Sequence, residues 1–392
     1  MYNFDEIIER RGTHSLKWDV KENELPMWVA DMDFRTAPEI IDALNKRASH
    51  GIFGYSTVPD EWYDAYIDWW RSRHNLSIER EQLIFCAGVV PAISSAVRKL
   101  TTPAEKVLIQ TPVYNIFYNS ILNNGRQVTE NPLKYQNGEY SVDFADLERK
   151  LSDPQTTLMI LCNPHNPAGK IWDRDTLAKI GGLCKRYNVT VISDEIHCDL
   201  TDPDKGYIPF SSVSEECRDN SVTCISPTKA FNLAGIQTAA VMVPNPNLRH
   251  KMWRALNTDE VAEPNAFAVT ASVAAFTKGG EWLDELREYI FENKRFAAEF
   301  IKKEIPKLTL ASSDATYLLW IDCSRMLGMA DEAAELIRSE TGLFLSAGST
   351  YGTGGGDFLR MNIACPKEML ADGLNRLKVG INEYEKYVLE RC

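Results

Sequence analysis

The chain has 392 residues and a formal net charge of −12, with 44% hydrophobic and 25% charged residues. This balance is typical of a soluble globular protein, and the length exceeds the size at which one hydrophobic core usually stops growing, so we expect two domains. The acidic surplus argues against nucleic acid or an anionic membrane as the main partner, because both attract basic surfaces.

Nothing in the sequence indicates export or membrane insertion. No apolar run follows the acidic start, so we expect no signal peptide, and no apolar stretch is long enough to span a bilayer. The nine cysteines include no C-x-x-C pair, which predicts reduced thiols and a cytoplasmic location. Because Cys162, His165, His197 and Cys198 fit no zinc-binding spacing, we expect no metal site.

The N-terminal part is predicted to be irregular over residues 1–35. Its stretch 25–34 is too apolar for a free tail, so we expect it to pack near a functional site or a partner subunit. A helix is predicted over residues 36–49, with proline in its first turn and apolar residues on one face. The next helix, 61–74, carries aromatic residues at a spacing more typical of a core than of a cofactor site.

Alternation of strands and helices dominates the middle of the chain. Four short apolar runs alternate with predicted helices, at residues 83–87, 106–110, 158–162 and 189–193. This pattern predicts an α/β fold with a mostly parallel, doubly wound sheet. Further strands are expected at 221–225 and 238–243, and helices at 247–257 and 264–304. The last helix is long enough to link two domains.

Residues 306–392 are predicted to form a smaller α+β domain. Its strands are expected at 316–321 and 358–363, and its helices at 330–341 and 367–388. The glycine-rich stretch 352–356 lacks the Lys-Ser/Thr of a P-loop and is predicted to be a turn.

Small and polar residues collect where the predicted strands end, which is where open α/β sheets bind ligands. They are Gly88, Tyr114, Asn163, Asn166, Asp194 and Lys229. An acid and a lysine at the ends of neighbouring strands suit pyridoxal 5′-phosphate (PLP), which needs a protonated ring nitrogen and an imine. The turn after Gly88 leads into a helix whose free N–H groups suit a phosphate. Each signal is weak alone, since a surface lysine beside a strand-end acid is common; their shared placement favours one site.

Two residues keep alternative interpretations at this level. Tyr114 follows a strand end, where its ring either lies over a flat cofactor or packs as a buried tyrosine. Arg360 lies in an apolar strand, where it binds either a substrate carboxylate or a structural acid partner.

The whole chain resembles the PLP-dependent enzymes of fold type I in the class I/II aminotransferase superfamily, and among them the cystathionine β-lyases (C–S lyases) of the MalY/PatB type. The motifs that carry the resemblance are PMWVADMDF (26–34), FGYS (53–56), TPVY (111–114), NPHNP (163–167), SDEIH (193–197), TKAFN (228–232) and RMNIACP (360–366). The first and last favour the lyase subgroup over general aminotransferases.

The resemblance implies a domain organisation. Residues 36–285 would form a large PLP-binding domain with a mostly parallel seven-stranded sheet, and residues 286–392 a small α+β domain. Residues 1–35 would pack against the small domain and the site.

The resemblance also implies a role for each site residue. Lys229 would be the Schiff-base lysine and proton shuttle, Asp194 the partner of the pyridinium nitrogen, and Tyr114 the ring that stacks on the cofactor. Asn166 and His197 would hydrogen-bond its phenolic oxygen. The phosphate would be bound by the N–H groups of Val89 and Val90, by Ser226 and by Tyr55 of a neighbouring subunit. Arg360 would bind the substrate α-carboxylate, with Ala30 and Asn166 nearby. A homodimer with shared active sites follows from the role of Tyr55.

Two positions depart from the superfamily pattern. Gln237 stands where many members carry an arginine or lysine that contacts the phosphate. His197 stands where many aminotransferases have a tyrosine, which leaves its contact open.

The activity that the resemblance implies is β-elimination. L-cystathionine or a related S-substituted L-cysteine would give a thiol, pyruvate and ammonia. An aminotransferase of amino acids would use the same lysine, acid and arginine, and a regulatory protein-binding role on a PLP fold is the alternative from another class.

Overall fold

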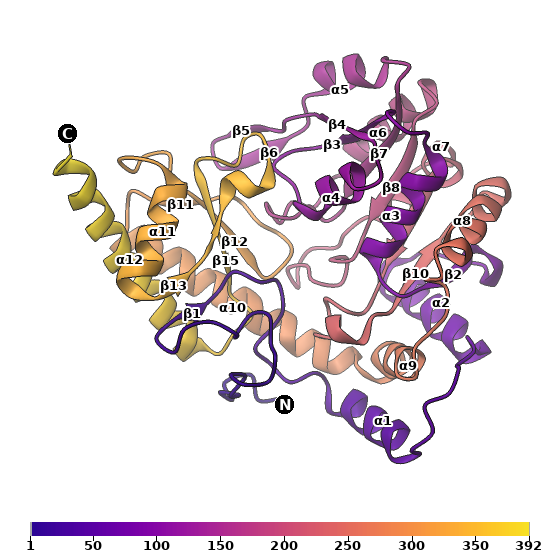
Figure 1. Ribbon diagram of the computed structural model, residues 1–392, viewed down its shortest axis with the longest axis horizontal. Helices are drawn as coiled ribbons and strands as arrows, with labels where there is room; N and C mark the ends of the chain where they lie inside the picture. Colours follow the sequence, from indigo (N-terminus) through magenta and orange to yellow (C-terminus); the bar gives the residue numbers. More distant parts are fainter. Residues whose placement is uncertain (1, 392) are drawn as a thin grey trace.

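The computed structural model describes residues 2–391, which form two lobes built on a seven-stranded and a four-stranded sheet (Figure 1). The larger sheet has the order β2-β10-β9-β8-β7-β3-β4. Its strands are β2 (Leu83–Cys86), β3 (Lys106–Ile109), β4 (Gln127–Glu130), β7 (Thr156–Cys162), β8 (Thr190–Asp194), β9 (Ser221–Ile225) and β10 (Ala239–Met242). Only β10 runs antiparallel to its neighbours β2 and β9, which confirms the predicted mostly parallel sheet.

Helices cover both faces of the large sheet, which explains why its strands are apolar throughout. Successive strand residues point to opposite faces, so Ile84 packs on one side and Phe85 on the other. One face is covered by α3 (Val89–Leu100), α4 (Ile116–Leu122) and α8 (Pro246–Thr258). The other face is covered by α2 (Asp60–His74), α5 (Phe144–Leu151), α6 (Arg174–Arg186), α7 (Glu215–Asp219) and α9 (Ala268–Lys278). The aromatic side chains of α2 lie in this core, as predicted.

The small lobe is an antiparallel sheet covered by two helices. Its strand order is β11-β12-β15-β14, with β11 (Thr309–Leu310), β12 (Leu318–Asp322), β14 (Ser346–Ala347) and β15 (Phe358–Asn362). The helices α11 (Ala330–Thr341) and α12 (Lys367–Leu389) contribute the apolar residues of its core.

One long helix, α10 (Gly280–Glu304), runs from one lobe to the other (Figure 1). Its first half supplies Trp282 and Leu286 to the core under the large sheet, and its second half supplies Ala297 and Ile301 to the core of the small lobe. The prediction of one continuous helix over 264–304 is wrong, because α9 ends at Lys278 and the chain turns at Gly279. A Cβ at Gly279 would lie 2.5 Å from the ring of Phe231, so the turn depends on a tertiary contact.

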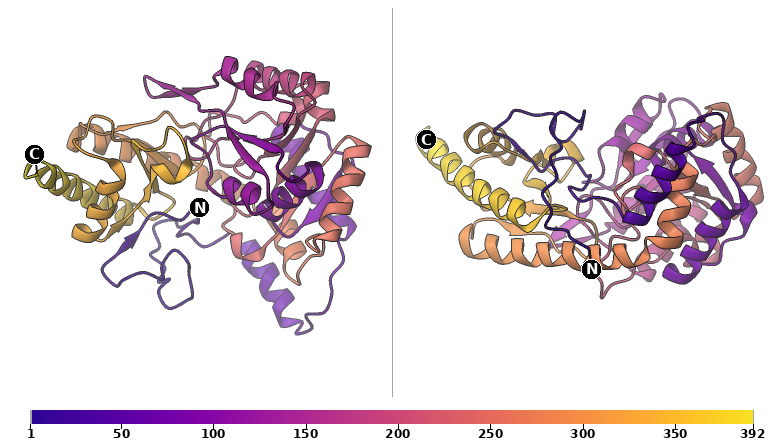
Figure 2. Two further views of the ribbon diagram at one scale, coloured as in Figure 1. Left: turned by 45° about the horizontal axis from the view of Figure 1, so that its top comes forward. Right: turned by 90° about the horizontal axis from the view of Figure 1, so that it is seen from below.

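The N-terminal segment passes over the small lobe before it enters the large one (Figure 2). There β1 (Leu25–Pro26) pairs in parallel with β13 (Leu343–Phe344), and further along α1 (Pro38–Ser49) packs against α9. A hairpin of β5 (Lys134–Gln136) and β6 (Glu139–Ser141) projects from the large lobe. No helix in residues 2–391 is both long and apolar enough to cross a membrane. The eight cysteines of this range are all buried and unpaired.

Candidate functional site

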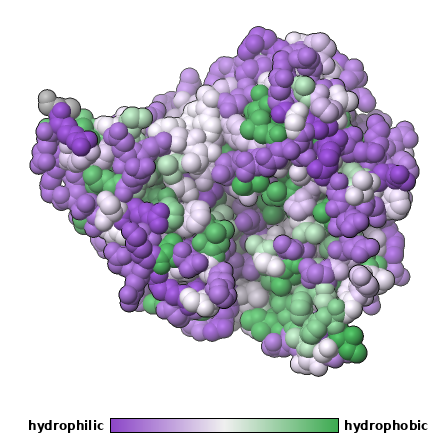
Figure 3. Space-filling view, in the orientation of Figure 1, coloured by the Kyte–Doolittle hydropathy of each residue, from purple (hydrophilic) through white to green (hydrophobic). Residues whose placement is uncertain are grey.

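A cavity of about 770 Å³ lies between the two lobes at the carboxyl ends of the parallel strands. The surface is hollowed between the lobes in Figure 3. Nine of the residues predicted for the site line this cavity: Ala30, Val89, Val90, Tyr114, Asn166, Asp194, His197, Lys229 and Arg360. They come from the N-terminal segment, five parts of the large lobe and one strand of the small lobe. The structure therefore brings together side chains that are far apart in the sequence.

Lys229 lies in the turn that follows β9. Its Nζ donates a hydrogen bond to the carbonyl oxygen of Ala30 at 2.6 Å, and the hydroxyl of Tyr317 donates to the same oxygen at 2.9 Å. Burial, together with the Arg360 charge, lowers the pKa of Lys229 to about 8, although the Asp31 and Asp194 charges oppose this shift. A substantial fraction of the amine is therefore neutral near pH 8, as a proton acceptor requires.

Asp194 is the last residue of β8, and it is almost completely buried. One of its carboxylate oxygens accepts the backbone N–H of Ile196 at 3.1 Å. Burial raises the pKa of Asp194 to about 7, and the Glu195 charge contributes in the same direction. A cationic partner entering the cavity would favour the ionised form of this carboxyl.

His197 lies beyond the same strand and is only 3% exposed. Burial lowers its pKa to about 3, with contributions from the Lys229 and Arg360 charges, so the imidazole is neutral at physiological pH. Its Nδ1 has no hydrogen-bond partner among residues 2–391. A buried ring nitrogen without a partner in a cavity wall indicates a place for a polar ligand atom.

Arg360, in β15, is 6% exposed and has no carboxylate within ion-pair distance among the described residues. Its Nη2 donates to the Trp28 carbonyl at 2.6 Å and its Nη1 to Asn166 Oδ1 at 3.4 Å, while Nε has no partner. A buried guanidinium without a counter-charge is costly, so it favours a ligand carboxylate over a structural acid partner.

Tyr114 lies in the loop between β3 and α4 and lines the same cavity. Its backbone N–H donates to the carbonyl of Asn166 at 3.0 Å, which ties together the loops that follow two neighbouring strands. Burial and the Asp194 charge raise the pKa of its hydroxyl to about 12, so the phenol is neutral.

The N-terminus of α3 forms another wall of the cavity. Gly88 precedes the helix without a side-chain cap, and the first turn contains no acidic residue. The N–H groups of Val89 and Val90 belong to this turn, where a helix leaves its N–H groups without intrahelical partners and attracts anions. Gln237 and Thr228 also line the cavity, so neutral donors are available where the superfamily pattern expects a cation.

Comparison with known proteins identifies the family. The model of "Aminotransferase class I and II" matches residues 23–377. The chain belongs to the class I and II aminotransferase family. Cystathionine β-lyase PatB of Bacillus subtilis is 45% identical to this chain over 388 residues, covering 97% of the chain and 100% of the relative. Protein MalY of Escherichia coli is 35% identical, covering 95% of this chain and 97% of the relative.

Solved structures of class I and II aminotransferase relatives share the fold. A PLP-bound putative aminotransferase from Clostridium difficile superposes with a TM-score of 0.95 at 39% identity, covering 97% of this chain and 100% of that one. The PLP-bound C–S lyase from Staphylococcus hominis gives a TM-score of 0.91 at 32% identity, covering 97% and 98%.

Two of the predicted site residues, Ser226 and Tyr55, do not line the cavity. The Ser226 Oγ donates to the Thr238 carbonyl at 2.7 Å, accepts the Thr228 N–H at 3.1 Å and contacts Thr228 Oγ1 at 2.7 Å. Its hydrogen bonds are thus made within the turn. Tyr55 is fully exposed at the surface. The phosphate-binding roles of both residues stay predictions.

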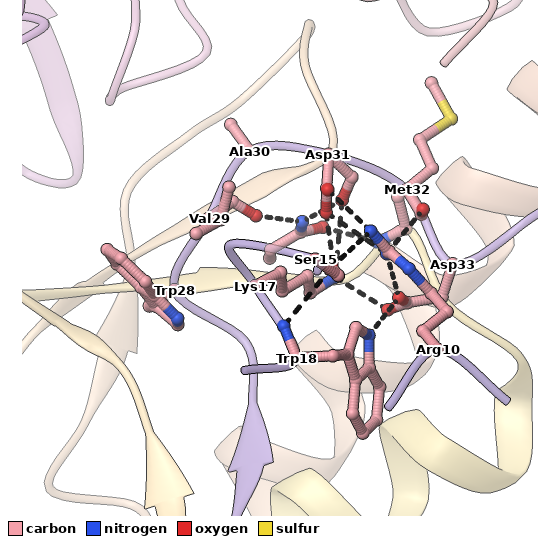
Figure 4. A network of polar contacts seen from close by, with 12 residues as sticks. Arg10, Ser15, Lys17, Trp18, Trp28, Val29, Ala30, Asp31, Met32 and Asp33 are labelled. Atoms are coloured by element: carbon pink, nitrogen blue, oxygen red, sulfur yellow. Dashed lines mark hydrogen bonds and ion pairs between the residues drawn. The ribbon is translucent and has the colours of Figure 1, made fainter. Parts of the chain in front are cut away.

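The sequence does not reveal a set of side-chain hydrogen bonds to the backbone of residues 28–32, the part of the N-terminal segment that is labelled in Figure 4. The carbonyls of five consecutive residues, 28–32, each accept a hydrogen bond from a side chain. Asn362 donates to the Val29 and Asp31 carbonyls, and Asn232 to that of Met32. Asn232 lies in the TKAFN motif and Asn362 in the RMNIACP motif, but no local pattern in the sequence shows that these side chains bind a segment more than 190 residues away.

Proposed function

We propose that the protein is a PLP-dependent C–S β-lyase that cleaves L-cystathionine or a related S-substituted L-cysteine to a thiol, pyruvate and ammonia. The observation that carries this proposal is the buried Arg360, which has no acid partner among residues 2–391 and lines the same cavity as Lys229 and Asp194. An α-amino acid supplies the missing carboxylate and an amine together. The names of PatB and of the C–S lyase from S. hominis favour elimination over other reactions of the family.

The residues of the cavity fit PLP. Lys229 would hold it covalently through Nζ, Asp194 would pair with its ring nitrogen, and the first turn of α3 would bind its phosphate. His197 has an unpartnered ring nitrogen for a polar atom of the cofactor, and Tyr114 presents an aromatic ring. The C. difficile aminotransferase relative and the S. hominis C–S lyase are both PLP-bound in their structures, which supports the same cofactor here.

PLP, when bound, stabilises negative charge that develops at the substrate Cα. Arg360 binds the substrate carboxylate and so orients the Cα–H bond. The amine of Lys229, which the substrate amine would displace from the cofactor, would then take the Cα proton; its pKa of about 8 in the cofactor-free chain favours the neutral form that this step needs. Asp194 holds the proton on the ring nitrogen of the cofactor. The thiol then leaves from Cβ with the proton that Lys229 took from Cα, and water hydrolyses the remaining three-carbon product to pyruvate and ammonia.

The experiment that tests this proposal measures absorbance and product together. The purified protein is expected to show the absorption band of a lysine-bound PLP and to release pyruvate from L-cystathionine. The Lys229→Ala variant should lose the band and the turnover, whereas Lys251→Ala, a change at an exposed lysine of α8, should keep both. Pyruvate release by Lys229→Ala at the wild-type rate would contradict the assignment.

An aminotransferase is the second candidate, because the family model and the C. difficile relative carry that name. The two reactions are separated by supplying an amino acid with a 2-oxo acid. A new amino acid without pyruvate or thiol would move the conclusion to transamination.

The proposed assembly is a cytoplasmic homodimer with shared active sites. The loop before α2 supports the dimer, because Ile52, Phe53 and Tyr55 are exposed apolar or aromatic side chains on a segment that is neither helix nor strand. The proposed domain division is 1–35, 36–285 and 286–392; the change of core along α10, which lies between Phe291 and Ala297, supports a boundary within this helix.

A further inference from the structure

A compact cluster of four charged side chains lies behind the Ala30 wall (Figure 4). Arg10 binds both acids, with Nη2 at 2.7 Å from Asp31 Oδ2 and Nη1 at 2.6 Å from Asp33 Oδ1. Lys17, only 1% exposed, lies 2.6 Å from Asp33 Oδ2 and 3.7 Å from Asp31 Oδ1. Two acids and two cations balance each other, which explains how four ionisable groups are tolerated at a half-buried position.

The cluster is joined to the site by a single peptide unit. Asp31 follows Ala30, whose carbonyl oxygen accepts the Lys229 Nζ at 2.6 Å. The carbonyl of Asp31 itself accepts Lys17 Nζ at 3.3 Å and Asn362 Nδ2 at 2.6 Å. Both sides of the Ala30 carbonyl are thus held, and the carboxylate of Asp31 is kept in one place by Arg10.

We propose that Asp31 is a positioning residue for the reaction: held by Arg10 and Lys17, it fixes the Ala30 carbonyl against the amine of Lys229 and keeps a negative charge near that amine. The role of Lys229 as the proton acceptor rests on the proposed function. The position and the charge of Asp31 do not depend on the proposed function, because they are features of the cofactor-free chain.

The charges that face Lys229 show why such a residue is useful. Burial and the Arg360 charge make the amine less basic, and the negative charges of Asp31 and Asp194 counteract them. The tyrosines that adjoin the site, Tyr114 and Tyr317, are neutral because burial raises the pKa of each hydroxyl. His197 is neutral as well. Asp31 is therefore one of two acids that keep Lys229 basic enough to take a proton from carbon.

The test measures the proton affinity of Lys229 in the full-length chain freed of cofactor. Brief labelling with acetic anhydride over a range of pH, with mass spectrometry of the peptide that contains Lys229, gives the midpoint of its titration. Asp31→Asn leaves the cluster with a net positive charge, so the midpoint should fall, on the order of one pH unit. Arg10→Gln leaves a net negative charge, so the midpoint should rise. Glu6→Gln, an exposed change in the same segment, should leave it unchanged.

Opposite signs distinguish positioning by charge from mere loosening of the segment, since loosening would shift both variants the same way. Shifts of Asp31→Asn and Arg10→Gln in the same direction, or no shift in either, would overturn the proposal. If Asp31→Asn fails to fold by circular dichroism, the rise in Arg10→Gln and recovery in Asp31→Glu decide the matter. In the PLP-loaded chain, the pH at which the absorption band changes should move with the same signs. A wild-type chain without any band would refute the proposed function and leave the labelling result valid.

Discussion

Arg360 of the small lobe and Asn166 of the large lobe contact each other in the cavity, with Arg360 Nη1 donating to Asn166 Oδ1 at 3.4 Å. The contact is long for a hydrogen bond, and it leaves the guanidinium free to take a stronger acceptor. Nη2 stays bound to the Trp28 carbonyl, so Nη1 and Nε are the groups available to a substrate carboxylate.

Replacing Arg360 by glutamine should weaken substrate binding. The loss of a charge-assisted hydrogen bond, about 1.5–3 kcal/mol, predicts a KM for L-cystathionine roughly 10- to 100-fold higher. The lysine variant should recover only part of this, because lysine cannot form the planar bidentate pair. Steady-state kinetics with Arg295→Gln, at an exposed position of α10, provide the control. An unchanged KM in Arg360→Gln would mean that another group binds the carboxylate.

The stability of the cofactor-free protein should depend on pH through Asp194. Its pKa is raised from 3.8 to about 7 by burial, so between these values the folded chain holds a proton that the unfolded chain has released. Raising the pH through this window therefore favours unfolding, by up to ~4 kcal/mol at 1.36 kcal/mol per pH unit. Urea unfolding at pH 5 and pH 7 should show that the wild type loses stability between these pH values relative to Asp194→Asn, because asparagine does not titrate. Parallel curves for the two proteins would contradict the raised pKa.

Two adjacent glycines of α6 should respond in opposite ways to alanine. A Cβ at Gly181 would overlap Cys217 Sγ and approach the Phe210 ring at 3.5 Å, so Gly181→Ala should destabilise the fold by about 1–3 kcal/mol. A Cβ at Gly182 meets nothing within 4 Å, and alanine there should stabilise the helix by roughly 0.5–1 kcal/mol. The midpoints of urea unfolding measure both effects. Equal shifts would show that α6 and α7 are not packed as described.

The proposed dimer predicts a concentration-dependent mass. Phe53 is 56% exposed in the chain, so Phe53→Asp should leave the folding of the monomer intact and prevent association by burying a charge in the interface. Sedimentation analysis should give twice the chain mass for the wild type and the chain mass for the variant. Leu389→Asp, at a similarly exposed residue near the end of α12, should remain dimeric. A wild-type monomer at all concentrations would refute the shared active site.

The large sheet, and the grouping of polar residues along one edge of it, could be predicted from the sequence for one reason. Apolar runs of strand length between helical segments predict parallel strands, and the carboxyl ends of such strands meet along one edge. Asp194 and Lys229 therefore had to be neighbours once β8 and β9 were placed. The N-terminal cluster was not predictable in this way, because Arg10 and Lys17 show no periodic pattern and meet their acids through irregular backbone.

By itself the sequence determined the order of strands and helices, the polar residues at strand ends and the apolar character of residues 25–34, since each is a local pattern of burial. Only the tertiary structure decided that the Ala30 carbonyl faces Lys229, that Arg360 has no acid partner in the described part of the chain and that the chain turns at Gly279. These features depend on contacts between residues up to 332 positions apart, such as that of Trp28 with Arg360. Such contacts form only when the two lobes and the N-terminal segment pack together.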